Sequence, residues 1–137
     1  ATPISKRIET AKKLKSETNA LVGIHLMPVI PFITDDKQNL ENIIKLAKNL
    51  NLDFVVVDML NLYGETRKSF FEFVDENFPK KSSLIKELYS NSKKIKEYNI
   101  NLHKIIKEIK NKYNFHNKYL KLQEIKQLSI FDVDDKK

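Results

Sequence analysis

The sequence predicts an α/β fold in which a parallel strand, helix, strand unit closes a larger barrel or sheet and is followed by helices. Two short apolar segments, at 20–27 and 53–59, are rich in strand-forming residues. The segment between them has its apolar residues at helical spacing, so the three segments form a βαβ unit. Past Gly64 the pattern is wholly helical. Because two strands do not make an independent parallel sheet of ordinary size, we expect the remaining strands to lie upstream of Ala1.

The first expected element is a helix over residues 3–17, with Thr2 as its cap and Pro3 at its first helical position. Its apolar residues recur at helical spacing: Ile4, Ile8, Ala11 and Leu14. The strand ALVGIHLM at 20–27 follows. We expect this strand to end at the proline pair of PVIP, residues 28–31, because proline lacks the N–H group that a strand ladder uses.

A polar turn at 32–36 leads into a second helix. Its apolar stripe consists of Leu40, Ile43, Ile44, Ala47 and Leu50. The strand DFVVVDM at 53–59 contains three consecutive valines, which is typical of a parallel strand covered on both faces. The crossover between the two strands should be right-handed. Three more helical segments follow, at 65–78, 82–98 and 101–113.

Length and composition describe one ordinary globular domain. The 137 residues are 41% hydrophobic and 31% charged, which is too apolar for a disordered chain. There is no cysteine, which excludes disulfides and thiolate metal sites within these residues and makes the cytoplasm the expected compartment. No apolar run approaches the roughly 20 residues of a membrane span, and the first residues lack the apolar core of a signal peptide. Because residue 1 is alanine, we expect a fragment or a processed product.

A combination of short motifs over residues 4–90 resembles the second half of radical SAM proteins, in particular the group related to spore photoproduct lyase. An arginine-led helix at Arg7 is followed by a strand that runs into the P-x-I-P turn at 28–31. Asp35 comes shortly after this turn, and then a helix and the apolar strand at 53–59. The next segment, ETRKSFFEFVDENFP, has the arginine, phenylalanine and F-P spacing found after the last barrel strand of these proteins.

The resemblance implies that residues 1–78 form the C-terminal portion of a partial (β/α)6 TIM-like barrel, with a helical extension at 79–116 and a frayed helix and tail at 117–137. Radical SAM enzymes hold a [4Fe-4S] cluster on three cysteines near the first strand, and the cluster reduces S-adenosylmethionine to a 5′-deoxyadenosyl radical. Since this chain has no cysteine, the cluster-binding strand would lie outside it. The parent protein would be a lyase-like enzyme with DNA as a candidate substrate, and this fragment alone would be inactive.

The resemblance also implies a set of cofactor-binding residues. The fifth-strand motif G-x-I-x-G-x-x-E supports the adenine of the cofactor, and its four positions are occupied here by Pro28, Ile30, Phe32 and Asp35. Only Ile30 matches outright. Independently of the family, function in parallel barrels sits on loops at the C-terminal ends of the strands, which adds Asp58 and Asn61 as candidates. The prolines could instead form a rigid strand exit, and Asp58 could be a helix or turn cap.

Other titratable residues give weaker indications. The acidic pairs at 35–36 and 134–135 are expected to be solvated. The histidines have none of the spacings that metal sites prefer: His25, His103 and His116. His25 is expected to pack beside its strand, with a place in the active cavity as the alternative. Because the chain holds two glycines, P-loop and Rossmann phosphate sites are excluded within these residues.

The basic character of the chain permits binding to nucleic acid. The net charge is +7, and residues 80–126 contain thirteen lysines and four glutamates with tyrosines interspersed. Such a surface could bind DNA phosphates, and the alternative is a pair of helices with solvated lysine faces. The stripe of Leu102, Ile105, Ile106 and Ile109 on these helices is expected to pack against the barrel.

The C-terminal QLSIF segment looks like the short peptide by which bacterial repair and replication proteins bind the sliding clamp. Gln127, Leu128 and Phe131 would take the anchoring positions, and packing at the end of a helix is the alternative. Two other interpretations of the whole chain stay open at this point. One is a non-catalytic basic helical module that binds nucleic acid or a clamp, and the other is a TIM-barrel enzyme without a cluster.

Overall fold

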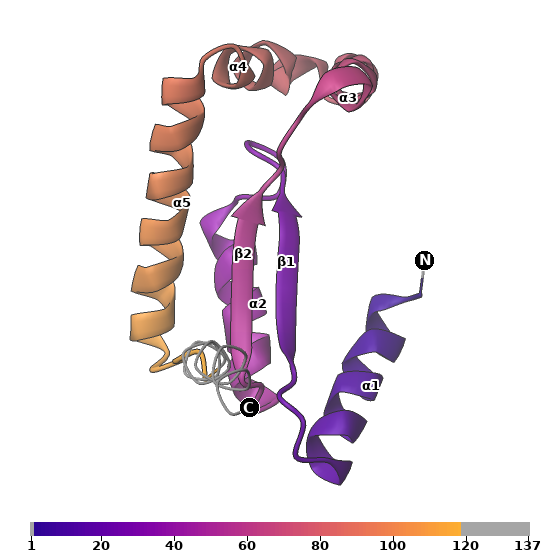
Figure 1. The fold of residues 1–137 in the computed structure, drawn as a ribbon, viewed down its shortest axis with the longest axis vertical. Coiled ribbons are helices and arrows are strands. Elements are labelled where there is room, and N and C mark those ends of the chain that lie inside the picture. The colour runs from indigo at the N-terminus through magenta and orange to yellow at the C-terminus, as the bar shows by residue number, and fades with distance from the viewer. Residues whose placement is uncertain (1, 119–137) are drawn as a thin grey trace, which may run out of the picture.

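The computed structural model describes residues 2–118, which form five helices and a two-stranded parallel sheet (Figure 1). The elements in chain order are α1 (Ile4–Glu17), β1 (Gly23–Val29), α2 (Lys37–Asn49), β2 (Phe54–Met59), α3 (Gly64–Asn77), α4 (Pro79–Tyr89) and α5 (Ser92–Lys112). The mixed α/β class and the strand, helix, strand unit are thereby confirmed. The partial barrel stays a prediction, because two strands do not close one.

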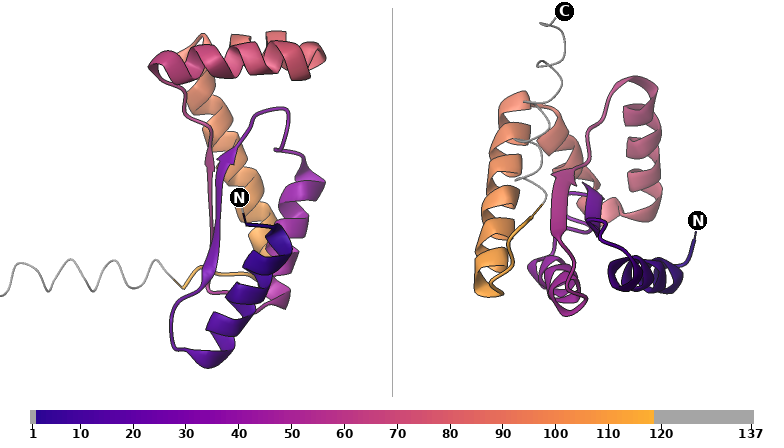
Figure 2. Two further views of the ribbon diagram at one scale, coloured as in Figure 1. Left: turned by 90° about the vertical axis from the view of Figure 1, so that its right-hand side faces the viewer. Right: turned by 60° about the horizontal axis from the view of Figure 1, so that its bottom comes forward.

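The two strands pair in parallel and are joined by a right-handed crossover. Gly23 pairs with Phe54 and Val29 with Met59. α2 lies behind the two strands in the view of Figure 1, and Figure 2 confirms that it covers one face of the sheet. With β2 to the left of β1, this connection has the expected hand. The fully buried residues of α2 that face the sheet are Leu40, Ile44 and Ala47.

β1 is shifted toward the C-terminus relative to the predicted strand at 20–27, because it begins at Gly23 and continues through Pro28 to Val29. The expectation that the proline pair ends the strand at residue 27 is therefore wrong. The pairing register shifts between Leu26 and Val29, so Pro28 lies at an irregularity where the ladder does not require its missing N–H group. The strand resumes pairing at Val29, whose carbonyl accepts a hydrogen bond from Leu60 N at 2.8 Å.

Two helix boundaries also differ from the prediction. Pro3 is the residue before α1, and no side chain caps that helix, so Thr2 is not its cap. The predicted break between 82–98 and 101–113 is wrong as well, since α5 runs without interruption from Ser92 to Lys112. The true break is at 90–91, where the Asn91 side chain caps α5 by accepting a hydrogen bond from Lys93 N at 2.8 Å.

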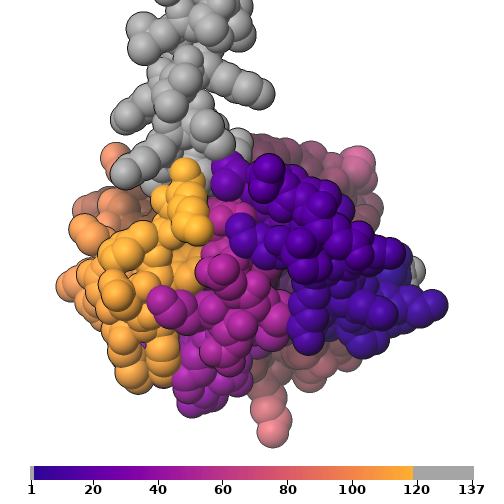
Figure 3. Space-filling view, turned by 90° about the horizontal axis from the view of Figure 1, so that it is seen from below, coloured from indigo at the N-terminus to yellow at the C-terminus, as the bar shows by residue number. Residues whose placement is uncertain are grey.

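One cluster of buried apolar residues extends from the strands into the C-terminal helices. The predicted stripe on α5 contributes Leu102, Ile106 and Ile109 to this core, and Ile105 is half-buried against it. Seen from below, α2 lies between α5 and α1 (Figure 3). α1 differs from the other helices in the described part of the chain, because none of its residues is buried.

The outer edge of β2 is sealed near the start of the strand by the segment that follows α5. The amide of Asn117 imitates a neighbouring strand: its Oδ1 accepts from Val55 N at 3.1 Å, and its Nδ2 donates to Val55 O at 3.1 Å. Lys110 Nζ donates to the same carbonyl, and Lys118 N donates to Asp53 O at 2.8 Å. The opposite edge of the sheet, along β1, has no partner strand among residues 2–118.

We expect Asn117→Ala to destabilise the protein by about 1 to 3 kcal/mol, because it leaves the N–H group of buried Val55 without its acceptor and removes one of the two side-chain donors to Val55 O. The measurement is the free energy of urea unfolding, together with hydrogen exchange at the Val55 amide, which should become faster. Asn111→Ala is the matched control, since Asn111 is exposed on α5. Equal stability of the two variants would show that the edge contact contributes nothing.

Candidate functional site

The C-terminal ends of β1 and β2 lie together, and α3 and α4 lie beyond them (Figure 1). The hydrogen bond from Leu60 N to Val29 O joins the two loops that leave the strands. The structure places all six predicted site residues on these strand ends and loops: Pro28, Ile30, Phe32, Asp35, Asp58 and Asn61. This end of the sheet is therefore the candidate site.

The turn after β1 is held by its own hydrogen bonds. Ile30 N donates to Thr34 Oγ1 at 2.8 Å, and the N–H groups of Ile33 and Thr34 donate to Ile30 O at 3.1 and 2.9 Å. Both backbone groups of Ile30 are thus engaged within the turn. What Ile30 can offer a ligand is its half-buried side chain.

Phe32 has a left-handed backbone, with φ of 62°, which is a conformation that glycine adopts at least cost. Its carbonyl accepts a hydrogen bond from Lys81 Nζ of α4 at 2.5 Å. Its ring lies 6.1 Å from the ring of Tyr98 of α5. The two C-terminal helices therefore hold the tip of this turn.

Asp35 is engaged by the helical extension. The Tyr98 hydroxyl donates to Asp35 Oδ2 at 2.5 Å, and burial together with this carboxylate raises the pKa of Tyr98 far above its ordinary value. Asp36 has a separate role, because its carboxylate caps α2 by accepting from Asn39 N at 3.1 Å. The expectation that this acidic pair is merely solvated is wrong, since each carboxylate has a defined partner.

The loop after β2 is held in the same way by Tyr89 of α4. The Tyr89 hydroxyl donates to Leu60 O, and burial raises the pKa of Tyr89 to about 12. Arg67 of α3 donates to Tyr89 O at 2.8 Å, and its guanidinium lies 5.3 Å from the centre of the Phe71 ring. The sequence offered one signal for these residues, namely tyrosines interspersed among the lysines of residues 80–126.

The remaining predicted site residues make few contacts. Asp58 is half-buried in β2, and its Oδ1 accepts from Met59 N at 2.9 Å. Pro28 and Asn61 are exposed. Across residues 2–118, no hydrogen bond joins one of the six predicted side chains to another. The six residues share one end of the sheet, but their side chains do not form a hydrogen-bonded cluster.

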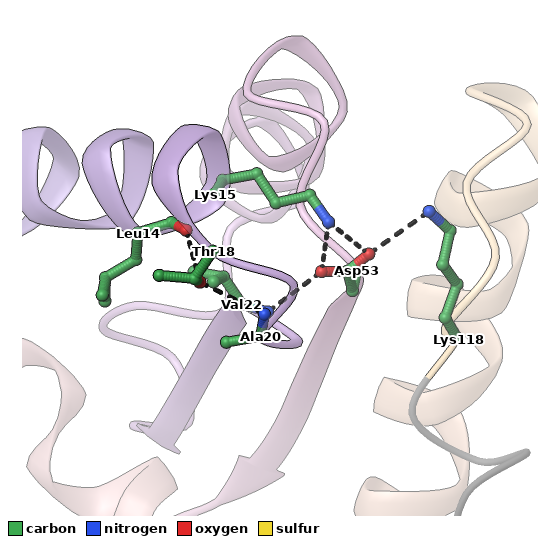
Figure 4. Close-up of polar contacts among 7 residues, drawn as sticks. All are labelled: Leu14, Lys15, Thr18, Ala20, Val22, Asp53 and Lys118. Atoms are coloured by element: carbon green, nitrogen blue, oxygen red, sulfur yellow. Dashed lines mark hydrogen bonds and ion pairs between the residues drawn. The ribbon is translucent and has the colours of Figure 1, made fainter.

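The opposite end of the sheet is organised by a buried carboxylate, Asp53, which the sequence did not single out (Figure 4). Lys15 Nζ of α1 donates to both of its oxygens at 2.7 and 2.6 Å, and Val22 N donates to Oδ2 at 3.0 Å. Lys118 Nζ lies 3.2 Å from Oδ1. Burial raises the pKa of Asp53, but the hydrogen bonds from Lys15, Val22 and Lys118 together have the larger effect in the opposite direction. The pKa of Asp53 therefore lies below its ordinary value.

The histidines show no metal site within residues 2–118, where no group of three or more histidine, cysteine or acidic side chains could hold an ion. His25 is exposed on β1, and its ring packs edge-on against the Phe54 ring with centroids 5.5 Å apart. Gly23 makes this packing possible, because a Cβ atom there would lie 2.4 Å from the Phe54 ring. His25 also lines a groove beside α1.

Several of the lysines in the basic extension are neutralised by acidic neighbours. Lys94 pairs with Glu87 at 2.7 Å and Lys86 with Asp75 at 2.6 Å. Four lysines of α5 form no ion pair with any residue of 2–118. Lys96, Lys104 and Lys107 are exposed, whereas Lys110 is half-buried and donates to Val55 O. The basic surface is therefore narrower than the lysine count suggests.

The predicted clamp-binding residues Gln127, Leu128 and Phe131 lie outside the described residues. Within residues 2–118, no helix is long and apolar enough to cross a membrane. No model of a known protein family matches the chain, and neither a curated protein nor a solved structure matches it.

Glu41 of α2 accepts hydrogen bonds from Lys112 and Tyr113, and these bonds lower its pKa from 4.5 to about 2. The contribution of this carboxylate to stability is fully present above the unfolded pKa, and it is lost as the pH falls toward the folded pKa. We therefore expect Glu41→Gln to destabilise the protein at neutral pH, with a difference from the native chain that shrinks below about pH 4.5.

Urea unfolding of both proteins over this pH range measures the effect. Glu108→Gln is the control, since Glu108 is exposed on α5 and its substitution should change nothing at any pH. A difference for Glu41→Gln that did not depend on pH would show that the ionised carboxylate is not the source of its effect.

Proposed function

We propose that this chain is the closing part of the barrel of a radical SAM enzyme related to spore photoproduct lyase. The observation that carries the proposal is the backbone of Phe32. This residue occupies the position of the second glycine in the adenine-binding motif, and its positive φ is the conformation for which glycine is suited. The right-handed parallel unit and the gathering of the candidate residues at the strand ends give further support.

The residues at this end fit the adenine of S-adenosylmethionine in part. Ile30 and Phe32 offer half-buried apolar side chains that would hold a ring. The backbone groups of Ile30 and the carbonyl of Phe32 already have partners, so apolar contacts would replace backbone hydrogen bonds to the cofactor. The Asp35 carboxylate is bonded to Tyr98, so in this proposal it fixes the turn and does not bind the cofactor.

Asp58 and Asn61 stand on the neighbouring strand end and loop, where they would contact the cofactor or the substrate. Tyr89, Tyr98 and Lys81 are positioning residues in this proposal, since their bonds hold the two loops from outside the site. A [4Fe-4S] cluster requires thiolate ligands, and these would come from a part of the parent protein outside this chain. When bound, the cluster and S-adenosylmethionine would supply radical chemistry for hydrogen abstraction from the substrate.

Anaerobic reconstitution of the parent protein tests the proposal. We expect it to bind about four iron atoms per chain and to bind S-adenosylmethionine. Ile30→Asp should weaken binding of the cofactor at least about tenfold without changing the iron content, because it places a charge against the adenine. Ile100→Asp is the matched control on the exposed face of α5. A parent protein that binds no iron would overturn the proposal and favour a barrel enzyme without a cluster.

A second candidate function is nucleic-acid binding by the exposed face of α5. The observation that favours it is the set of unpaired lysines there, Lys96, Lys104 and Lys107, on a helix that carries seven lysines and two glutamates. Lysines without an acidic partner are the ones free to neutralise phosphates. This face is also compatible with DNA as the substrate of the proposed enzyme.

Reversal of these three charges to glutamate should weaken DNA binding by the parent protein at least about tenfold and flatten its salt dependence. Fluorescence anisotropy with a labelled duplex at several salt concentrations measures both effects. The control reverses Lys6, Lys12 and Lys13 of α1, which changes the net charge equally on a different surface. An equal loss in both variants would indicate a general charge effect and contradict a binding face on α5.

A further inference from the structure

β1 is unusually exposed for a parallel strand. Three of its seven residues are exposed, namely His25, Met27 and Pro28, whereas four of the six residues of β2 are buried. Strands in parallel sheets are ordinarily covered on both faces, and interior strands are also paired along both edges. Among residues 2–118, β1 is paired along one edge, by β2.

The backbone groups at the unpaired edge can be identified. Val22 O accepts from Asp53 N of the neighbouring strand segment, and alternate residues of a strand direct their backbone groups to the same side. Ile24 and Leu26 therefore face β2, while His25 and Met27 direct their N–H groups to the free edge. The sealed edge at Asn117 leaves this side as the place where the sheet can be extended.

An apolar groove of about 350 Å³ lies beside the free edge, between α1 and α2. Its apolar lining includes Ile4, Ile8, Ala11, Ile24, Leu26 and Ile43. The apolar stripe of α1 faces this groove, yet no residue of α1 is buried and Ile4 is 67% exposed. α1 thus presents a hydrophobic face that residues 2–118 leave largely uncovered.

α1 is held beside the groove by a charge contact. Lys15 donates to both oxygens of Asp53 at the base of β2, so the helix position does not depend on filling the groove (Figure 4). α1 lies beside α2 and on the side of β1 away from β2 (Figures 2 and 3). A right-handed crossover helix takes this place when the strand before it lies parallel to β1 at the free edge.

We propose that the free edge of β1 and the groove between α1 and α2 bind a parallel β-strand, which is supplied by the segment of the parent protein that leads into α1. Its length would be about five to seven residues, to match β1. Its side chains toward the groove would be apolar and β-branched, and those on the opposite face would lie beside His25. The proposal shares with the proposed function the premise of a longer protein, but it requires neither cofactor nor cluster.

Hydrogen exchange of the parent protein tests this pairing directly. We expect the amides of His25 and Met27 to exchange as slowly as those of Ile24 and Leu26. Rapid exchange at His25 and Met27, with slow exchange at the other two, would overturn the proposal by showing a free edge. Protection that disappears on dilution would also overturn it, because the partner would then be a second copy of the chain.

A pair of exposed isoleucines supplies an independent test. Ile4 and Ile100 are 67% and 61% exposed, so exposure within this chain predicts the same small effect for Asp at either position. If a strand fills the groove, Ile4→Asp should lower the melting temperature of the parent protein by at least about 4 °C and accelerate exchange at His25, whereas Ile100→Asp should do neither. Equal melting temperatures would contradict a filled groove.

The iron content of the same protein separates the two proposals. Slow exchange at His25 and Met27 in a protein that binds no iron would support the proposal of an added strand and overturn the radical SAM assignment. Iron binding together with rapid exchange at both amides would support the radical SAM assignment and overturn the added strand.

Discussion

Asp53 is the contact on which the arrangement of the chain depends most. A buried carboxylate is costly unless it is paired and hydrogen-bonded, and here its partners come from α1, from the residue before β1 and from the segment after α5. Since α1 has no buried residue, the bond from Lys15 is its firmest attachment to the sheet. The same carboxylate therefore fixes both the sealed edge of β2 and the helix that borders the free edge of β1.

The opposite end of the sheet is held by hydroxyl groups. Tyr98 bonds the carboxylate of the turn after β1, and Tyr89 bonds a carbonyl of the loop after β2. Each tyrosine stands on a different C-terminal helix, and each helix also contributes to the common apolar core. The extension is for this reason a structural part of the α/β unit, and the shape of the candidate site depends on residues more than 20 positions away in the chain.

The fold could be predicted from the sequence where the signal is local. Three valines indicated β2, the apolar stripe of residues 40–50 indicated α2, and parallel pairing then brought the candidate residues to one end. The predictions that were wrong concern boundaries that depend on tertiary contacts or on a helix cap. β1 passes Pro28 because its register shifts there, and the break before α5 depends on the Asn91 cap within a continuous lysine-rich pattern. The bond between Asp35 and Tyr98 joins residues 63 positions apart and leaves no trace in local spacing.

The two edges of the sheet differ in whether another strand can pair with them, and this difference cannot be predicted from the composition of the chain. Because Asn117 occupies the backbone groups of Val55 and Lys118 N bonds the carbonyl of Asp53, the outer edge of β2 is blocked at its start, whereas the outer edge of β1 has no partner strand among residues 2–118. The lysines of α5 lie beside the sealed edge, the candidate cofactor residues lie at the strand ends, and the groove lies beyond β1. The three proposed surfaces do not compete for the same residues, so one parent protein could add strands, bind a cofactor and contact DNA at once.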